Sequence, residues 1–184
     1  MPGEDEGLDV TDLILLLLHA HAHSAQGRIP PEIHGSTRLQ KLLFLAVNEM
    51  PGPSGLGDVA KSLGFRPYHY GPFSERVEDS VAFLESMKLV EVTRVGRGSL
   101  MERLEQWEAS HPFEVSDESQ AIYRLTRDGV AVADKLKAMA GHRTWEFLCR
   151  MVKKYGGMRL GELLFFVYDK YPEMATRSRL KPGS

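Results

Sequence analysis

The sequence contains one cysteine, Cys149, among its 184 residues, so it cannot form an intramolecular disulfide. It also lacks a long apolar run, because the run at residues 13–18 is far shorter than the roughly 20 residues that a membrane-spanning helix needs. Acidic residues occupy the N-terminus, where a secretory signal requires positive charge. We therefore expect a protein of the reducing cytoplasm with no membrane partner.

Excess positive charge is absent as well. The net charge is -2 and the isoelectric point is about 6.4, whereas many nucleic-acid-binding domains are strongly basic. Any nucleic-acid site must therefore be a local patch. The hydrophobic content of 42% is sufficient for a folded core, which excludes a disordered chain.

No catalytic, cofactor or metal motif stands out. The Gly-Arg-Gly at residues 96–98 lacks the rest of a dinucleotide or phosphate-loop fingerprint, and we interpret it as a turn of a wing. His19 and His23 are four residues apart, but no acidic residue completes a zinc pattern, so with His21 they are predicted to be surface histidines at a helix end. Cys149 lies on an apolar stripe and is predicted to be a buried packing residue. We expect no catalytic residue, no metal and no cofactor.

Apolar periodicity and breaker residues divide the chain into elements. Helices are predicted at about residues 12–24, 37–50, 56–63, 74–88 and 126–140, then two more, the last at 159–171. Asp12 is the expected cap of the first helix. Strands are predicted at residues 88–92 and 121–126.

This order predicts a mainly α protein with a small β-wing, an α+β fold, built as a winged-helix-like core with additional C-terminal helices. The expected parts are a flexible N-terminus (1–10), a winged-helix-like domain (11–140), a C-terminal helical extension (141–175) and a flexible tail (176–184). Residues 96–120 form a long insertion between the two strands of the wing, in which a short helix is expected.

The most informative segment is residues 66–74, an aromatic and basic stretch interrupted by Gly71 and Pro72. Ser74 is a good N-cap, so we expect this segment to be a loop that leads directly into the next helix. The apolar side chains of that helix fall on one stripe: Phe73, Val77, Val81, Leu84 and Met87. In a winged helix, a helix at this point is the recognition element.

Seven residues are candidate nucleic-acid contacts: Arg38, Lys41, Arg66, Ser74, Arg76, Arg94 and Arg97. They would grip a phosphate backbone if they converge. However, the linker at 64–73 is longer than the turn of roughly 3–4 residues in a helix-turn-helix. The helix at 74–88 also carries more acidic than basic residues, which repels phosphates. Two interpretations stay open: this helix reads DNA, or it packs in the core and reads nothing.

Six aromatic residues are candidate partner contacts: Tyr68, His69, Tyr70, Phe73, Phe165 and Phe166. The first four can stack on bases or on a peptide, or can pin their loop to the core through rings and hydroxyls. The two phenylalanines lie off the apolar stripe of the last helix. That helix is therefore predicted to be largely buried between two surfaces, one of which a partner subunit of a homodimer can supply.

Several of these motifs, in the same order, resemble the YwgA-like group of uncharacterised prokaryotic proteins. They are RLQKLLFL at 38–45, Phe65 with YHYGPFS at 68–74, the segment at 84–91, YRLT at 123–126, and VYDKYPE at 167–173 with Ser178. More distantly, the Leu-Gln-Lys-Leu helix followed by Tyr-Gly-Pro resembles the Panacea or SocA-like antitoxin domain, whose members bind and neutralise toxins. The resemblance implies a winged-helix-like regulator or interaction module.

Two functional hypotheses follow. In the first, the protein regulates transcription by binding duplex DNA as a homodimer through a winged helix. In the second, the same scaffold is a protein-binding module of antitoxin or adaptor type that does not bind DNA and presents its Tyr-Gly-Pro loop to a partner polypeptide.

Overall fold

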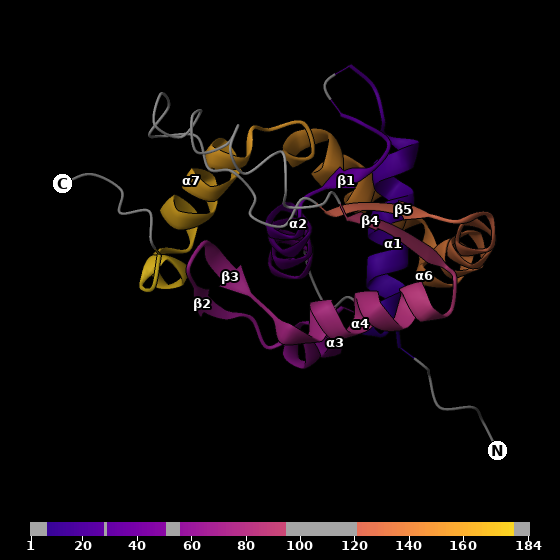
Figure 1. Ribbon diagram of the computed structural model, residues 1–184, viewed down its shortest axis with the longest axis horizontal. Helices are drawn as coiled ribbons and strands as arrows, with labels where there is room; N and C mark the ends of the chain where they lie inside the picture. Colours follow the sequence, from indigo (N-terminus) through magenta and orange to yellow (C-terminus); the bar gives the residue numbers. More distant parts are fainter. Residues whose placement is uncertain (1–6, 28, 51–55, 95–120, 179–184) are drawn as a thin grey trace.

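The computed structural model describes residues 7–27, 29–50, 56–94 and 121–178. Its elements in chain order are α1 (Val10–His23), β1 (Ile33–His34), α2 (Ser36–Glu49), α3 (Gly57–Leu63), β2 (Arg66–Tyr68), β3 (Gly71–Phe73), α4 (Glu75–Ser86), β4 (Val90–Arg94), β5 (Ala121–Leu125), α6 (Arg127–Tyr155), α7 (Leu160–Lys170) and the 3-10 helix η1 (Pro172–Ala175). The fold is mainly helical with small antiparallel sheets, as the sequence predicted (Figure 1).

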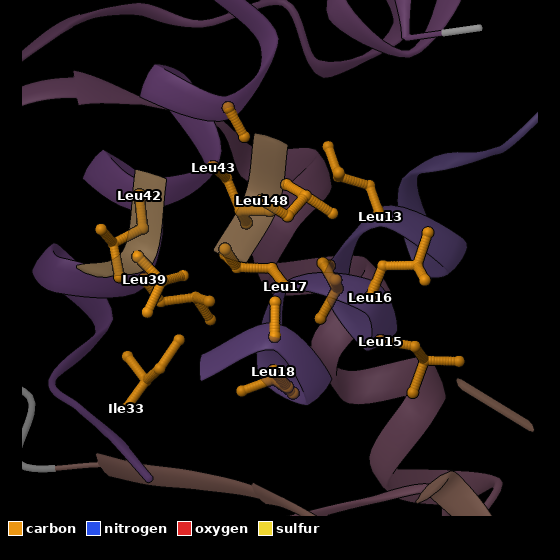
Figure 2. Packing of buried hydrophobic residues seen from close by; sticks show 14 of the residues in the cluster. Leu13, Leu15, Leu16, Leu17, Leu18, Ile33, Leu39, Leu42, Leu43 and Leu148 are labelled. Atoms are coloured by element: carbon orange, nitrogen blue, oxygen red, sulfur yellow. The ribbon is translucent and has the colours of Figure 1, made fainter. Parts of the chain in front are cut away.

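Helix α1 is the central element of the core. Its residues 13–18 are all buried, because α2, α3, α4, α6 and β5 contact it from different sides. Figure 2 shows leucines of α1 packed against leucines of α2 and against Leu148 of α6. Leu163 and Val167 of α7 belong to the same cluster, so the predicted boundary near residue 140 separates elements that share one core.

The cap of α1 differs from the prediction. Asp9, and not Asp12, is the N-cap: its carboxylate accepts a hydrogen bond of 2.8 Å from the Asp12 N–H. The Asp12 carboxylate accepts one of 3.1 Å from the Asp9 N–H, which completes a capping box. The apolar pattern locates the helix but does not choose between two aspartates three residues apart.

A three-stranded antiparallel sheet in the order β1-β5-β4 covers one side of the core. Strands β4 and β5 pair over their whole lengths, from Val90 opposite Leu125 to Arg94 opposite Ala121. The predicted wing insertion and Arg97 lie outside the described residues. Strand β1 was not predicted, since it is only two residues long and lies in a segment that the prolines mark as a break.

Helix α4 follows Ser74 as predicted, but two details at its end were wrong. Met87 is 56% exposed, although it was predicted on the buried stripe. The helix ends at Ser86, and Lys88 then adopts a φ of 57°, which turns the chain so that Leu89, not Met87, faces the core. For the same reason the following strand begins at Val90 rather than at Lys88.

Helix α6 begins after Thr126, whose hydroxyl accepts a hydrogen bond of 3.0 Å from the Gly129 N–H. The break predicted near residue 140 is a kink at Gly141, which has a φ of 81°. Helix α7 buries Leu163, Leu164, Val167 and Tyr168. No helix in the described ranges has the length and apolar character that crossing a membrane requires.

Candidate functional site

The predicted loop at residues 66–74 is a hairpin, in which β2 pairs with β3 from Arg66 opposite Phe73 to Tyr68 opposite Gly71. We call these residues, 66–73, the aromatic hairpin. The sequence predicted a loop here because proline and glycine are typical of loops. Here Pro67 and Pro72 lie opposite each other in a short two-stranded ribbon, where strand pairing tolerates proline.

Two consecutive side chains of α2 bind the hairpin and the start of α4. The Gln40 amide accepts a hydrogen bond from the Ser74 N–H and donates one to the Ser74 carbonyl, both 3.0 Å long. The Lys41 ammonium donates a hydrogen bond of 2.9 Å to the Pro72 carbonyl and is only 2% exposed. The backbone of the hairpin is therefore fixed to the core by buried polar contacts, which are strongly geometry-dependent.

Gly71 lets the hairpin lie close against α7. Its φ is +82°, and a Cβ there would lie 3.0 Å from Cε1 of Tyr168 and 3.3 Å from Cε of Lys41. The Tyr168 hydroxyl accepts a hydrogen bond of 2.8 Å from Ser178, and burial raises the pKa of this tyrosine. The hairpin thus has α2 on one side and α7 on the other, an arrangement visible in Figure 1.

Ser74 has a structural position that the sequence did not indicate. It is 1% exposed, and its hydroxyl donates to the Leu63 carbonyl at the end of α3 instead of capping α4. A phosphate could not reach this hydroxyl without displacing the packed ends of α3 and α4.

The aromatic side chains of the hairpin remain accessible although its backbone is fixed. Tyr68 is 41% exposed, and its ring stacks on His69 with centroids 4.3 Å apart and an interplanar angle of 17°. Its ring also lies 5.0 Å from that of Phe73. His69, Tyr70 and Phe73 are half-buried. Two interpretations were open for these rings: that they contact a partner, or that they hold the segment against the core. The structure has features of both, since the hairpin backbone is hydrogen-bonded to the core and the Tyr68 ring is exposed.

The basic candidates are mostly occupied by contacts within the chain. Arg38 donates to the Gly156 and Met158 carbonyls at the end of α6, at 3.3 and 2.7 Å. Arg66 forms an ion pair with Glu75. Arg94 makes two hydrogen bonds of 2.8 Å to Glu85, and this hydrogen bonding lowers the pKa of Glu85.

The outer face of α4 is acidic and partly apolar. Glu75, Glu78 and Asp79 are exposed there, as are Phe83 at 53% and Met87 at 56%. Arg76, the remaining basic candidate on this helix, is exposed and forms no ion pair within the described part of the chain. The structure does not gather the six nucleic-acid candidates that it describes into one positive surface.

The two phenylalanines of α7 have different environments. Phe165 is 65% exposed, so the described part of the chain does not supply the covering surface predicted for this ring. Phe166 is half-buried, with its ring 5.0 Å from that of Tyr155 and with the Lys154 and Lys170 ammonium groups 5.5 and 5.8 Å from its centroid. The two residues are about 100° apart around the helix, so only one of them meets α6.

The three histidines of α1 were predicted to lie at the surface, and for His21 this prediction is wrong. His21 is completely buried, although Ala22 and His23 next to it are exposed, and neither ring nitrogen has a hydrogen-bond partner. Burial lowers its pKa to about 4, with the nearby Pro31 backbone opposing the shift. His19 bonds Asp134 at 3.0 Å, and its ring lies 5.1 Å from Trp145. Across the described ranges, no three ligating residues are grouped as a metal site.

Sequence reasoning missed a basic surface on the second half of α6. Its exposed cations are Arg143, Arg150, Lys153 and Lys154, and Cys149 between them is half-buried rather than fully buried. A signal was available: residues 127–184 contain 12 of the 23 lysines and arginines but only 6 of the 25 carboxylates. The whole-chain net charge hides this difference between the two parts.

Comparisons of this chain with protein-family models, with curated proteins and with solved structures find no match.

Proposed function

We propose that this protein is a protein-binding module of antitoxin or adaptor type that uses its aromatic hairpin to bind a partner polypeptide. The observation that carries the proposal is that the hairpin backbone is held by Gln40 and Lys41 while the Tyr68 ring is 41% exposed. Rigid display of aromatic rings lowers the entropic cost of binding, and tyrosine is enriched among residues that dominate binding energy.

The surroundings of the hairpin favour a polypeptide over a polyanion. Arg66 is neutralised by Glu75, and the adjacent face of α4 carries further carboxylates. A protein partner tolerates this mixture of aromatic and acidic groups, whereas a phosphate backbone would be repelled by it.

A winged-helix-like core is part of the same proposal. Its support is the order α3, α4, β4, β5 and the antiparallel pairing of the last two strands. In such a core α4 holds the position of the recognition helix, and its acidic exposed face suits contact with a protein.

The competing candidate is a transcription regulator that binds duplex DNA as a homodimer through α4 and the wing. The same element order favours it, and Arg76 is the exposed cation on α4 that it would use. Binding of random duplex DNA at low salt that is lost in Arg76→Glu would support this candidate.

The protein-binding proposal is tested by identifying proteins that crosslink to the intact chain and measuring the affinity of the purified partner. We expect Tyr68→Ala to weaken binding by at least tenfold, because exposed tyrosines at binding surfaces are worth about 2 kcal/mol or more. Met139→Ala is the control, since Met139 is a large apolar residue, 69% exposed, on α6. Equal affinities of the wild type and Tyr68→Ala would refute the hairpin as the binding site.

A further inference from the structure

The second half of α6, after the kink at Gly141, carries a row of exposed cations that the proposed function does not use. Arg143, Arg150 and Lys154 are spaced by seven and four residues, so they lie within about 40° of one another around the helix. Lys153 flanks them. We call these four residues the cationic stripe. At 1.5 Å per residue it is roughly 16 Å long, which matches about five base-pair steps of duplex DNA.

These charges are largely free of counter-ions. Glu146 is the single carboxylate on this half of α6; it lies 3.0 Å from His142 and 3.9 Å from Arg150. The Arg150 side chain is 68% exposed, and an exposed pair at that distance contributes little. Within the described residues, Arg143, Lys153 and Lys154 form no ion pair with a carboxylate.

Neighbouring rings hold one end of the stripe in position. The Lys154 ammonium lies 4.7 Å from the centroid of Tyr155 and 5.5 Å from that of Phe166. The Lys170 ammonium lies 5.8 Å from the Phe166 centroid but is neutralised by Glu49, whose carboxylate is 2.7 Å away. The helix that carries the stripe is anchored in the core by Leu148 and Val152.

We propose that the cationic stripe binds the phosphate backbone of duplex DNA without reading its sequence. A row of three cations on one face of a helix, with Lys153 beside it, complements a linear array of phosphates. A membrane surface fits less well, because the apolar side of this helix is buried in the core and cannot insert between lipids. A single strand would need exposed rings for stacking, whereas Phe166 lies half-buried against Tyr155. The site does not depend on the proposed protein-binding function.

The proposal is tested by fluorescence anisotropy of a labelled 20-base-pair duplex of random sequence, titrated with the full chain at several salt concentrations. Four phosphate contacts predict that affinity falls roughly 100-fold between 50 and 200 mM salt. Arg150→Gln/Lys154→Gln should weaken binding at least tenfold and lower the slope of log affinity against log salt by about 1.8.

The matched control is Lys61→Gln/Arg76→Gln, which removes two exposed cations from α3 and α4. It should bind DNA like the wild type, and thermal unfolding should show that both double variants are folded. Absence of wild-type binding at 50 mM salt would overturn the proposal. Equal weakening by the control variant would also overturn it, and would instead support DNA binding through α4. Binding to phosphatidylserine vesicles but not to DNA would overturn it in favour of a membrane surface. Tyr68→Ala should not affect DNA binding, so this test and that of the hairpin fail independently.

Discussion

The side-chain amide of Gln40 and the backbone of Ser74 exchange two hydrogen bonds, each 3.0 Å long. A side-chain amide offers the same donor and acceptor as a peptide group, so Gln40 acts as an additional strand residue at the junction of β3 and α4. The next residue, Lys41, bonds Pro72 in the same hairpin. The Leu-Gln-Lys of α2 and the Tyr-Gly-Pro of the hairpin are thus two halves of one structural unit, although about 30 residues separate them in the chain.

Replacement of Gln40 should destabilise the fold. Gln40→Leu leaves the buried Ser74 N–H without its partner, and an unsatisfied buried donor costs about 1–3 kcal/mol. Urea unfolding followed by circular dichroism measures the change. Gln26→Leu is the control, because the same substitution at this exposed position should change the free energy of unfolding by less than roughly 0.5 kcal/mol. Similar free energies of unfolding for both variants would show that the hydrogen bonds between Gln40 and Ser74 do not contribute to stability.

Substitution of Gly71 by alanine should destabilise the fold in two ways, through the backbone conformation and through steric crowding. Gly71→Ala should lower the free energy of unfolding by about 1–2 kcal/mol for its positive φ and by a further 1–3 kcal/mol because the Cβ presses on Tyr168. Gly27→Ala carries only the first cost, since Gly27 has a φ of +61° and no atom near its added Cβ. Chemical unfolding of both variants gives the difference. Equal losses would mean that α7 moves away from the hairpin without cost.

His21 should make the protein sensitive to acid. Its pKa is about 4 in the folded state, below the ordinary value of 6.5, so the unfolded chain binds more protons between these pH values. The stability supplied by the neutral ring is complete above about pH 6.5 and is lost as the pH falls towards 4. Between these two pH values the free energy of unfolding should fall by roughly 3 kcal/mol. Unfolding in urea at a series of pH values measures this slope.

Two variants test whether His21 causes this dependence of the free energy of unfolding on pH. His21→Leu should flatten the dependence on pH, leaving the smaller contribution of His19, whose pKa burial also lowers while Asp134 opposes the shift. Gln26→Leu should leave the dependence unchanged, because it removes no titratable group. An unchanged slope in His21→Leu would assign the acid sensitivity to other groups.

The predicted homodimer gives different expectations for the two phenylalanines of α7. Phe165 is 65% exposed, so Phe165→Glu should convert a dimer into a folded monomer with little change in melting temperature. Phe166→Glu should lower the melting temperature, because its ring packs on Tyr155 within the chain. Light scattering after size exclusion, together with thermal unfolding, checks both. A monomeric wild type would exclude the dimer, whatever the variants do.

The local elements of this protein could be predicted from sequence because their causes lie within a few residues. Apolar spacing located α2 as Ser36–Glu49 within one residue of the predicted ends. Helix α3 ends at Leu63 and helix α6 begins at Arg127, each within one residue of the predicted position. The α+β class and the strand pair β4–β5 followed from the order of these elements, whereas β1 and the hairpin did not.

The tertiary structure alone decided which side chains are available for function. Arg38, Lys41 and Ser74 look like surface residues in the sequence, yet each is bound to backbone from a distant part of the chain. His21 was expected at the surface, and packing against distant segments such as the one at Gly156 buries it. Burial and pairing depend on contacts between segments far apart in sequence, which local periodicity does not encode. The sequence therefore determined where the helices lie, while their packing determined that the rings of the aromatic hairpin and the cations of the stripe are exposed.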